Sequence, residues 1–495
     1  MSEFSDRESS RIDGLGRREF LACLGAGAAA WLTPRAFGES AGDAARPNII
    51  VILADDLGYG DLGVTGCKDV PTPHIDAIAT GGVRFTHGYV SCPVCSPTRA
   101  GLMTGRYQQR FGHWYNPGPP VDEQPNIGLP LSETTIADRL KEAGYATGLV
   151  GKWHLGLGPE FHPMKRGFDE FFGFPHGSHS YVDSRADTKN PIMRGTEAVD
   201  EPAYLTEAFT REAVDFIRRR AGAPFFLYLS YNAVHGPLQA PDAYLERFKA
   251  IEDETRRTYA AMLSALDDGV GAVLAALREK GIEEDTLVFF LSDNGGPIAV
   301  NGSRNTPFSG AKGTLQEGGI RVPFFLRWPE RLPAGRTCDL PVISLDILPT
   351  CLAAAGGALP SDAPLDGVNL LPYLAGNEGA PHDYLFWRYH DGAAVRHAQW
   401  KLVKTDDGAC KLYDVVADPG EETDVAADHA EIVQVLRERL AQWEAELTSA
   451  LWPGRVGPAK EPKARQPGER AERRKRREER GEARPRRPGA RRQQT

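Results

Sequence analysis

Residues 48–56 read Asn48-Ile49-Ile50-Val51-Ile52-Leu53-Ala54-Asp55-Asp56, an apolar run that ends in two adjacent carboxylates. Four successive residues of this run are β-branched and no polar side chain interrupts it before Asp55, which is typical of a parallel strand buried on both faces. Similar runs occur at residues 146–150, 225–229 and 287–291. We therefore predict a large β-sheet, with residues 48–54 as one of its strands.

A long helical pattern lies between the last two of these strands. Apolar residues recur at helical spacing from Tyr259 to Leu277, and Gly281 follows as a typical helix stop. Alternating buried strands and helices are typical of an α/β sheet covered on both faces. The sequence therefore predicts an α/β fold.

Each predicted strand runs into residues that carry chemistry. The first ends in Asp55 and Asp56, and the others are followed by Lys152 and His154, by His235, and by Asp293 and Asn294. Open α/β sheets place their sites beyond the carboxyl ends of the strands. We therefore expect these side chains to meet in one cleft.

The pattern of apolar and turn residues changes after Leu374. Short strand-like pieces alternate with turn residues, and an amphipathic helix follows them, which predicts a small antiparallel sheet with one helix. The expected strands are 385–389, 393–397, 400–405 and 411–415, and the expected apolar face of the helix is Ile432, Val435, Leu436, Leu440, Trp443 and Leu447. We assign residues 46–375 to a catalytic α/β domain and residues 376–452 to a C-terminal α+β subdomain.

The two ends of the chain differ from this globular part. Residues 453–495 hold 16 Lys and Arg against 6 Asp and Glu, whereas the whole chain has a formal net charge of -9. Such a tail is most often solvated and disordered, and binding of an anionic partner is the alternative. The remainder is acidic, which argues against a nucleic-acid-binding protein.

The first 45 residues resemble an export signal and a linker. Arg17 and Arg18 precede an apolar Ala/Gly-rich stretch at 22–32, the order found in twin-arginine signals, and this predicts a periplasmic or secreted protein. A chance Arg pair before a buried helix is the alternative. The stretch is shorter than the roughly 20 residues that span a bilayer, and no later apolar run is expected to be long enough, so no transmembrane segment is predicted.

Cys95 lies in the segment Cys95-Ser96-Pro97-Thr98-Arg99. Pro97 suits the first turn of a helix, so Cys95 would sit at a helix N-terminus, where backbone N–H groups stabilise an anion. Arg99, one turn later, adds a positive charge. These features are those of a nucleophile, with a Cys92–Cys95 redox pair and a buried structural cysteine as the alternatives.

Two motifs make the family resemblance specific. Residues 95–99 with Thr104-Gly105-Arg106, and residues 144–154, resemble the two signatures of the type I, formylglycine-dependent sulfatases of the alkaline-phosphatase-like superfamily, including arylsulfatases and N-acetylgalactosamine-6-sulfatases. The resemblance covers residues 47 to about 426. It implies a large mixed β-sheet sandwiched by helices, and hydrolysis of sulfate esters.

The resemblance also implies a set of site residues. Cys95 would be oxidised to formylglycine (3-oxoalanine) by a separate formylglycine-generating enzyme, and one Ca²⁺, or Mg²⁺ in its place, would be bound. The implied metal ligands are Asp55, Asp56, Cys95, Asp293 and Asn294, and the implied catalytic residues are Cys95, Arg99, Lys152, His154, His235 and Lys312.

The substrate is the least determined property. Export and the resemblance of residues 161–172 and 176–183 to carbohydrate sulfatases favour a sulfated carbohydrate, with His179 and Arg304 as candidate substrate-binding residues. A phosphate or phosphonate ester hydrolase of the same superfamily is the main alternative, and a non-catalytic binding protein is a second one. The sequence does not indicate an oligomeric state.

Overall fold

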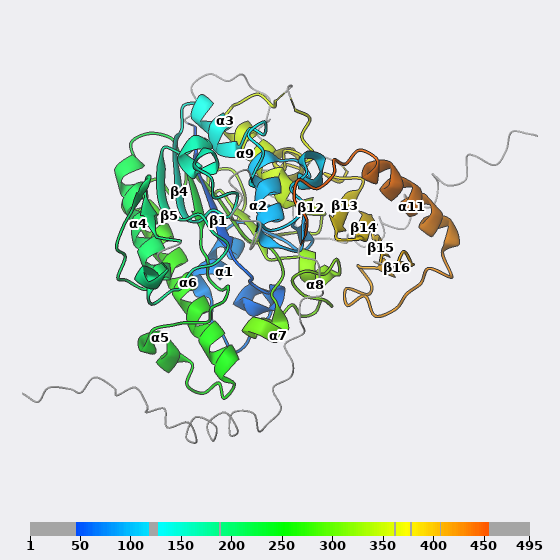
Figure 1. Cartoon of the computed structure of the whole chain (residues 1–495), viewed down its shortest axis with the longest axis horizontal. Coiled ribbons are helices and arrows are strands. Elements are labelled where there is room, and N and C mark those ends of the chain that lie inside the picture. The colour runs from blue at the N-terminus through cyan, green and yellow to red at the C-terminus, as the bar shows by residue number, and fades with distance from the viewer. Residues whose placement is uncertain are drawn as a thin grey trace, which may run out of the picture. The chain divides into compact units, whose positions relative to one another are not determined.

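A computed structural model describes residues 46–117, 127–187, 190–360, 363–376, 379–405 and 407–454. The expected export segment at 1–45 lies outside the described residues, as does the basic tail from residue 455 onward. Figure 1 shows the described residues as a coloured ribbon with a sheet at its centre.

The central sheet has ten strands in the order β11-β2-β10-β9-β1-β8-β4-β5-β6-β7. The four strands predicted from apolar runs are its inner members: β1 (Asn48–Ala54), β4 (Ala146–Lys152), β8 (Phe225–Ser230) and β9 (Thr286–Ser292). They pair in parallel, so their carboxyl ends share one edge of the sheet. The predicted α/β fold with a mixed sheet is confirmed, because β10 (Phe324–Arg327) pairs antiparallel with β9.

The shorter strands complete the sheet and a neighbouring two-stranded pair. In the ten-stranded sheet they are β2 (Val83–Phe85), β5 (Glu170–Phe174), β6 (Met193–Arg194), β7 (Glu197–Ala198) and β11 (Arg336–Cys338). The two-stranded pair consists of β3 (Gly88–Tyr89) and β12 (Val342–Ile343).

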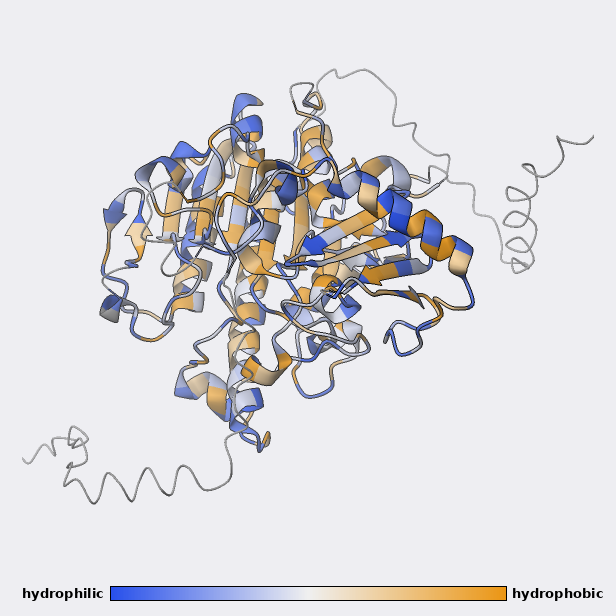
Figure 2. Cartoon of the chain, turned by 45° about the vertical axis from the view of Figure 1, so that its right-hand side comes forward, coloured by the Kyte–Doolittle hydropathy of each residue, from blue (hydrophilic) through white to orange (hydrophobic). Residues whose placement is uncertain are grey.

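Both faces of the sheet are covered by apolar cores, and Figure 2 shows that its inner strands are mostly hydrophobic. Side chains alternate along β1, so Ile49, Val51 and Leu53 join one apolar core while Ile50 and Ile52 join the other. Three helices pack in the second core: α1 (Pro73–Thr80), α4 (Leu205–Arg220) and α6 (Glu254–Glu279). Three others pack in the first: α2 (Cys95–Thr104), α3 (Ile136–Glu142) and α9 (Ile347–Ala354). The remaining helices of this part are α5 (Asp242–Arg247), α7 (Ile298–Asn301), α8 (Glu317–Ile320) and α10 (Leu371–Leu374).

Helix α6 extends the predicted pattern at both ends and stops before Gly281, which has a φ of 66°. By length and composition alone it could cross a membrane, so the expectation that no later segment is long enough is wrong. Most of α6 is buried within the molecule, where Tyr259, Met262 and Leu266 are fully covered. That is the arrangement of a core helix.

The small sheet has the order β13-β14-β15-β16, formed by Leu385–Tyr389, Gly392–His397, Trp400–Lys404 and Cys410–Asp414. Helix α11 (Ala430–Glu444) packs on it, and in Figure 1 these elements lie together on the right. Leu436, Leu440 and Trp443 are buried as predicted, but Val435 is 50% exposed and does not belong to the apolar face. Trp387 joins the first core and donates from Nε1 to the carbonyl of Val90 at 2.7 Å.

Candidate active site

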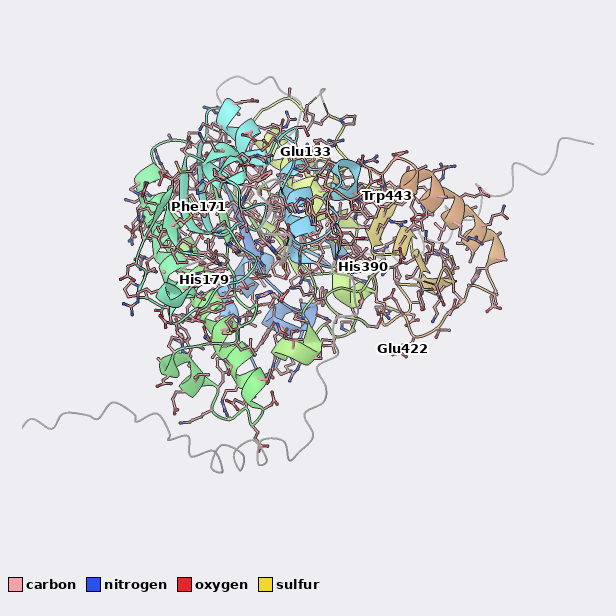
Figure 3. The ribbon with its side chains drawn as sticks, in the orientation of Figure 1. Glu133, Phe171, His179, His390, Glu422 and Trp443 are labelled. Atoms are coloured by element: carbon pink, nitrogen blue, oxygen red, sulfur yellow. The ribbon has the colours of Figure 1, made fainter. Side chains whose placement is uncertain are left out.

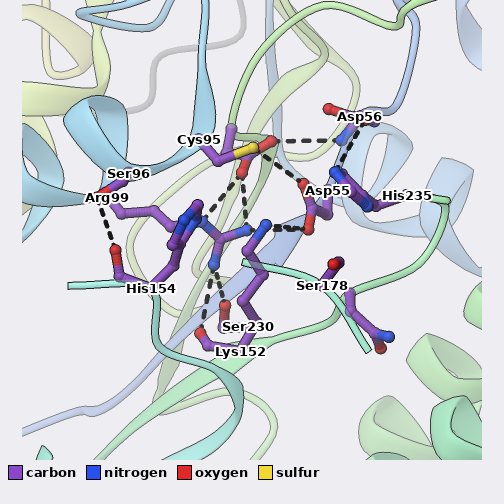
Figure 4. A network of polar contacts seen from close by, with 12 residues as sticks. Asp55, Asp56, Cys95, Ser96, Arg99, Lys152, His154, Ser178, Ser230 and His235 are labelled. Atoms are coloured by element: carbon purple, nitrogen blue, oxygen red, sulfur yellow. Dashed lines mark hydrogen bonds and ion pairs between the residues drawn. The ribbon is translucent and has the colours of Figure 1, made fainter. Parts of the chain in front are cut away.

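The carboxyl ends of β1, β4, β8 and β9 bring together the residues that sequence motifs had singled out. Figure 4 shows Asp55, Asp56, Cys95, Arg99, Lys152, His154 and His235 converging from these strand ends and from the start of α2. Lys312, from the loop before α8, joins them, since its Nζ lies 3.1 Å from the Cys95 sulfur. The predicted cleft residues therefore form one polar cluster.

Cys95 is the first residue of α2 and is 1% exposed. Its Sγ lies 3.5 Å from Asp55 Oδ1. Burial, helped by the nearby Asp293 carboxylate, raises the pKa of the Cys95 thiol to about 12. The thiol is therefore protonated at neutral pH. Among the described residues both Cys92 and Cys95 are free.

Three carboxylates and three cationic side chains balance in this buried cluster. Lys152 Nζ donates to Asp55 Oδ2 at 2.6 Å, and Lys312 Nζ donates to Asp56 Oδ1 at 2.6 Å. Burial opposes ionisation, but Lys152 lowers the pKa of Asp55 and Lys312 lowers the pKa of Asp56, so both carboxyls remain charged. The third pair is Arg99 with Asp293.

Arg99 is fully buried and its donors are all directed inward. Nε and Nη2 reach Asp293 Oδ2 at 3.0 and 2.7 Å. Nη1 donates to Ser230 Oγ at 2.5 Å and to the carbonyl of Lys152 at 3.3 Å. The guanidinium thus ties the ends of β4, β8 and β9 to helix α2.

The oxygen-rich side of the cluster fits a hard divalent cation. Asn294 Nδ2 donates to Asp56 Oδ1 at 2.7 Å, while Asn294 Oδ1 is buried without a hydrogen-bond partner. The backbone N–H of Asp56 faces Asp293 Oδ1 at 3.3 Å, which keeps that carboxylate beside the other two. A cation would supply the missing partner of the Asn294 oxygen, and an all-oxygen donor set suits Ca²⁺ or Mg²⁺.

His154 lies beyond the end of β4 and has a left-handed backbone with a φ of 61°. Lys152 and His154 would point the same way if both lay on a strand, yet the strand ends at Lys152. The backbone turn, rather than strand alternation, directs His154 into the cluster. Burial, with the charges of Lys152 and Arg99, lowers the pKa of His154 well below its usual range, so the ring is neutral.

A hydrogen-bond chain that the motifs did not predict holds this turn. Ser96 Oγ donates to the His154 carbonyl at 2.6 Å and lies 2.7 Å from His113 Nε2. The Ser96 backbone N–H donates to Asn116 Oδ1 at 2.8 Å. His113, Asn116 and Ser230 carry no sequence signal of their own, since an isolated polar residue is ambiguous until its neighbours are known. Ser96 lies inside the Cys95 motif, and that position was the only available signal.

His235 lies on the more open side of the cluster, with its side chain 24% exposed. Its Nδ1 is 2.6 Å from the carbonyl oxygen of Gly236. Because a carbonyl oxygen can only accept a hydrogen bond, Nδ1 is assigned the hydrogen. Nε2 therefore faces the cluster, 3.7 Å from Asp56 Oδ2.

The two candidate substrate-binding residues have other contacts. His179, labelled in Figure 3, is 3% exposed, and its ring nitrogens lie 2.8 Å from the carbonyls of Ser180 and Asn190. Arg304 is about half exposed and pairs with Asp69. Neither has a recorded contact with the cluster, so their role in substrate binding stays a prediction.

Comparisons with known proteins show the family to which the chain belongs. The sulfatase family profile matches residues 47–358, and the profile of the N-sulphoglucosamine sulphohydrolase C-terminal region matches residues 311–446. The N-acetylgalactosamine-6-sulfatase of Canis lupus familiaris is 38% identical over 388 residues, which cover 73% of this chain and 72% of that protein. Human arylsulfatase A is 36% identical over 479 residues, covering 84% and 91%.

Among solved structures, Ps i-CgsB in complex with k-i-k-neocarrahexaose superposes with a TM-score of 0.79 at 38% identity. The match covers 82% of this chain and 94% of that one. The profile spans more than half of the chain and the identities extend over most of it. The chain therefore belongs to the sulfatase family, whose members hydrolyse sulfate esters.

Proposed function

We propose that this sulfatase acts on a sulfated carbohydrate, with a formylglycine formed from Cys95 and one Ca²⁺ at the carboxylates. The observation that carries the proposal is the buried cluster around Cys95, in which carboxylates, two lysines and two histidines surround a thiol too weakly acidic to act as a thiolate. A protonated thiol is a poor nucleophile, and an oxidised side chain at this position would supply a different one.

Formylglycine supplies an aldehyde whose hydrate offers an oxygen nucleophile and a second hydroxyl. The neutral His154 ring is suited to accept the proton of that second hydroxyl, which lets sulfate leave. His235, with Nδ1 fixed on the Gly236 carbonyl, turns Nε2 toward the cluster, where it is placed to act on the departing alcohol. Ser96 and His113 keep the His154 backbone in place.

The sulfate oxygens need cationic donors. The ammonium groups of Lys152 and Lys312 both reach the cluster. Burial lowers the pKa of Lys312, but Asp56 and the neighbouring anions outweigh burial and raise it, so Lys312 stays protonated. The expectation that Arg99 also binds sulfate stays part of the proposal, although here its donors are directed to Asp293, Ser230 and a backbone carbonyl.

Asp55, Asp56, Asp293 and Asn294 would hold the cation, which adds positive charge beside a substrate that is itself an anion. Without it the cluster carries three negative and three positive side chains, and a sulfate ester gains little from a neutral site.

Dialysis against a chelator is expected to abolish sulfate release and to lower the melting temperature, with recovery on adding Ca²⁺. Elemental analysis measures the calcium content. Active protein that contains far less than one calcium ion per chain would contradict the assignment.

The carbohydrate substrate is supported by similarity. The dog relative is named for N-acetylgalactosamine 6-sulfate, and Ps i-CgsB was solved in complex with k-i-k-neocarrahexaose. A panel of sulfated glycosaminoglycan and carrageenan oligosaccharides, assayed for released sulfate, tests this. Activity confined to small aryl or alkyl sulfates would contradict the carbohydrate assignment.

The nucleophile and the reaction class are tested together. Intact-mass analysis of the Cys95 peptide from protein made with a formylglycine-generating enzyme should show the loss of sulfur and gain of oxygen that the aldehyde requires. The variant Cys95→Ala should lose at least about 10³-fold in kcat, because a removed nucleophile leaves only binding and electrostatic terms. Faster hydrolysis of a phosphate or phosphonate ester than of the matched sulfate ester would instead favour the alternative hydrolase.

We further propose that residues 1–45 direct export of the folded protein through the twin-arginine route. In this division of the chain, residues 46–375 form the catalytic part and residues 376–452 the C-terminal part. Residues 453–495 are proposed to be a solvated tail. The arrangement of Arg17 and Arg18 before an apolar stretch supports the export step. Replacing both with Lys should retain the protein in the cytoplasm of a bacterial host. Unchanged export of that variant would overturn the step.

A further inference from the structure

Three aromatic rings gather where the small sheet meets the start of α2. Tyr389 ends β13, and His390 and Asp391 form the turn into β14. Tyr115 comes from the loop after residues 108–111. Its ring centroid lies 5.3 Å from that of His390, with the planes 33° apart, and 6.3 Å from that of Tyr389. The Tyr389 and His390 centroids are 4.3 Å apart. We call Tyr115, Tyr389 and His390 the aromatic cluster.

The aromatic cluster is tied to the reactive centre by short contacts. The residue after Tyr115, Asn116, accepts a hydrogen bond from the backbone N–H of Ser96, which adjoins Cys95, at 2.8 Å. Gln109 Nε2 donates to the carbonyl of Arg388, one residue before Tyr389, at 2.8 Å. Burial, together with the nearby Cys92 thiol, raises the pKa of Tyr389, and Lys312 and Cys95 also act on its hydroxyl. Asn116 therefore places Tyr115 close to the residue that follows Cys95, and Gln109 ties the segment before Tyr115 to the strand that ends in Tyr389.

Lys312 lies at a less buried margin of the site, since its side chain is 17% exposed whereas Asp55, Arg99 and Lys152 are fully buried. Tyr115, Tyr389 and His390 are each half-buried, so each keeps part of its surface accessible. We expect a substrate whose sulfate reaches Lys312 to extend from this margin toward these residues.

We propose that the aromatic cluster is a sugar-binding subsite that holds a ring of the sulfated saccharide next to the scissile ester. Sugar rings have apolar C–H faces and polar edges, and Tyr and His offer flat apolar faces with a polar tip to match them. The proposal rests on the proposed carbohydrate substrate and goes beyond it by naming the residues that read the sugar. These residues lie on the C-terminal sheet and in the loop at residue 115, and are additional to the candidates His179 and Arg304.

The test compares substitutions within and outside the cluster. Tyr389→Ala should raise the KM for the most active sulfated oligosaccharide about three- to ten-fold, the range expected for loss of one aromatic contact. Inhibition by inorganic sulfate should be unchanged, because sulfate contacts Lys152 and Lys312 and not the rings. Tyr389→Phe keeps the ring and should keep KM within about two-fold of the native value.

The strand β13 offers a matched control. Tyr384, just before its other end, stacks on His397 at 4.6 Å with the planes 22° apart, so Tyr384→Ala removes a similar Tyr–His pair away from the site. It should leave the saccharide KM unchanged. His390→Asn is a second probe, because Asn tolerates the left-handed φ of 52° at this position and lacks the ring.

The outcomes separate the two proposals. Unchanged saccharide KM in both Tyr389→Ala and His390→Asn, in protein that releases sulfate normally, overturns the subsite and leaves the carbohydrate substrate standing. An equal weakening of inorganic sulfate inhibition overturns it too, since the rings would then shape the sulfate pocket. If native protein releases sulfate from no saccharide, the proposed carbohydrate substrate is itself wrong and the subsite falls with it.

Discussion

Gly177 illustrates how closely single residues are fitted around the catalytic bases. A Cβ at this position would lie 2.6 Å from His154 Nε2, inside any real contact distance. The His154 ring is buried and its Nδ1 has no hydrogen-bond partner, so packing against Gly177 is what limits its position.

We expect Gly177→Ala to displace the His154 ring and to lower kcat about 10- to 100-fold, the size of effect that misplacing a catalytic group by about 1 Å produces. Steady-state kinetics on a sulfate ester measure this. Gly222→Ala is the control, because a Cβ there meets nothing within 4 Å. Equal activity of the two variants would show that His154 is not held by Gly177.

At the scale of elements, a buried ion network joins the small sheet to the loop that carries Lys312. Lys401 Nζ, on β15, donates to Glu317 Oε1 at 2.8 Å and to Glu421 Oε1 at 3.0 Å. Glu421 Oε2 in turn accepts from Ser309 Oγ at 3.1 Å and from the Glu317 backbone N–H at 2.7 Å. Both ends of the Lys312 loop are therefore fixed by residues of the C-terminal part.

Lys401→Met should lower the free energy of unfolding by about 3–5 kcal/mol, because two buried carboxylates then lose their shared cation. Lys404→Met is the matched control on the same strand. Lys404 pairs with Glu444 at 2.9 Å in a part-exposed position, where such a pair contributes about 0–1 kcal/mol. Urea unfolding of both variants measures the difference, and similar losses would show that the Lys401 network contributes no more than a surface pair.

The same scale shows what sequence patterns can and cannot predict. Strands such as β1 and β9 could be predicted because each contains an unbroken apolar run, residues 49–54 and residues 287–291, which is stable only when buried. Strands of two or three residues, such as β3 and β6, carry too few residues for a period, and pairing with a neighbour alone defines them. Motif residues could be placed at the site, whereas Gly177 and His113 could not, since their role depends on what the folded chain brings against them.

At the scale of the whole molecule, His382 connects the segment that precedes the small sheet to the catalytic part. Its Nε2 lies 2.8 Å from Asp346 Oδ1, and Asp346 also accepts from the backbone N–H groups of Ile343 and Val368. Burial alone would lower the pKa of His382, but the Asp346 carboxylate outweighs burial and raises it above its ordinary value.

A histidine whose folded pKa is raised stabilises the fold fully below its unfolded pKa of about 6.5 and loses that contribution as the pH rises through the folded value. We therefore expect His382→Gln to lower the melting temperature most at mildly acidic pH, with the gap to the native protein narrowing at alkaline pH. Thermal unfolding across a pH series measures it. His397→Gln, at an exposed histidine that ends β14 and makes no ion pair with Asp346, is the control. A gap for His382→Gln that widens with pH would contradict the assignment.

The burial of Cys95 also sets an order on the life of the chain. Once α2 has packed and the strand ends have closed around it, no enzyme can reach a side chain that is 1% exposed. If Cys95 is oxidised as proposed, the oxidation has to precede the completion of folding, and the proposed cation loading and export would follow it. A chain that folded before meeting the modifying enzyme would then keep its thiol, so the proposal predicts that the yield of active protein depends on the relative rates of folding and oxidation.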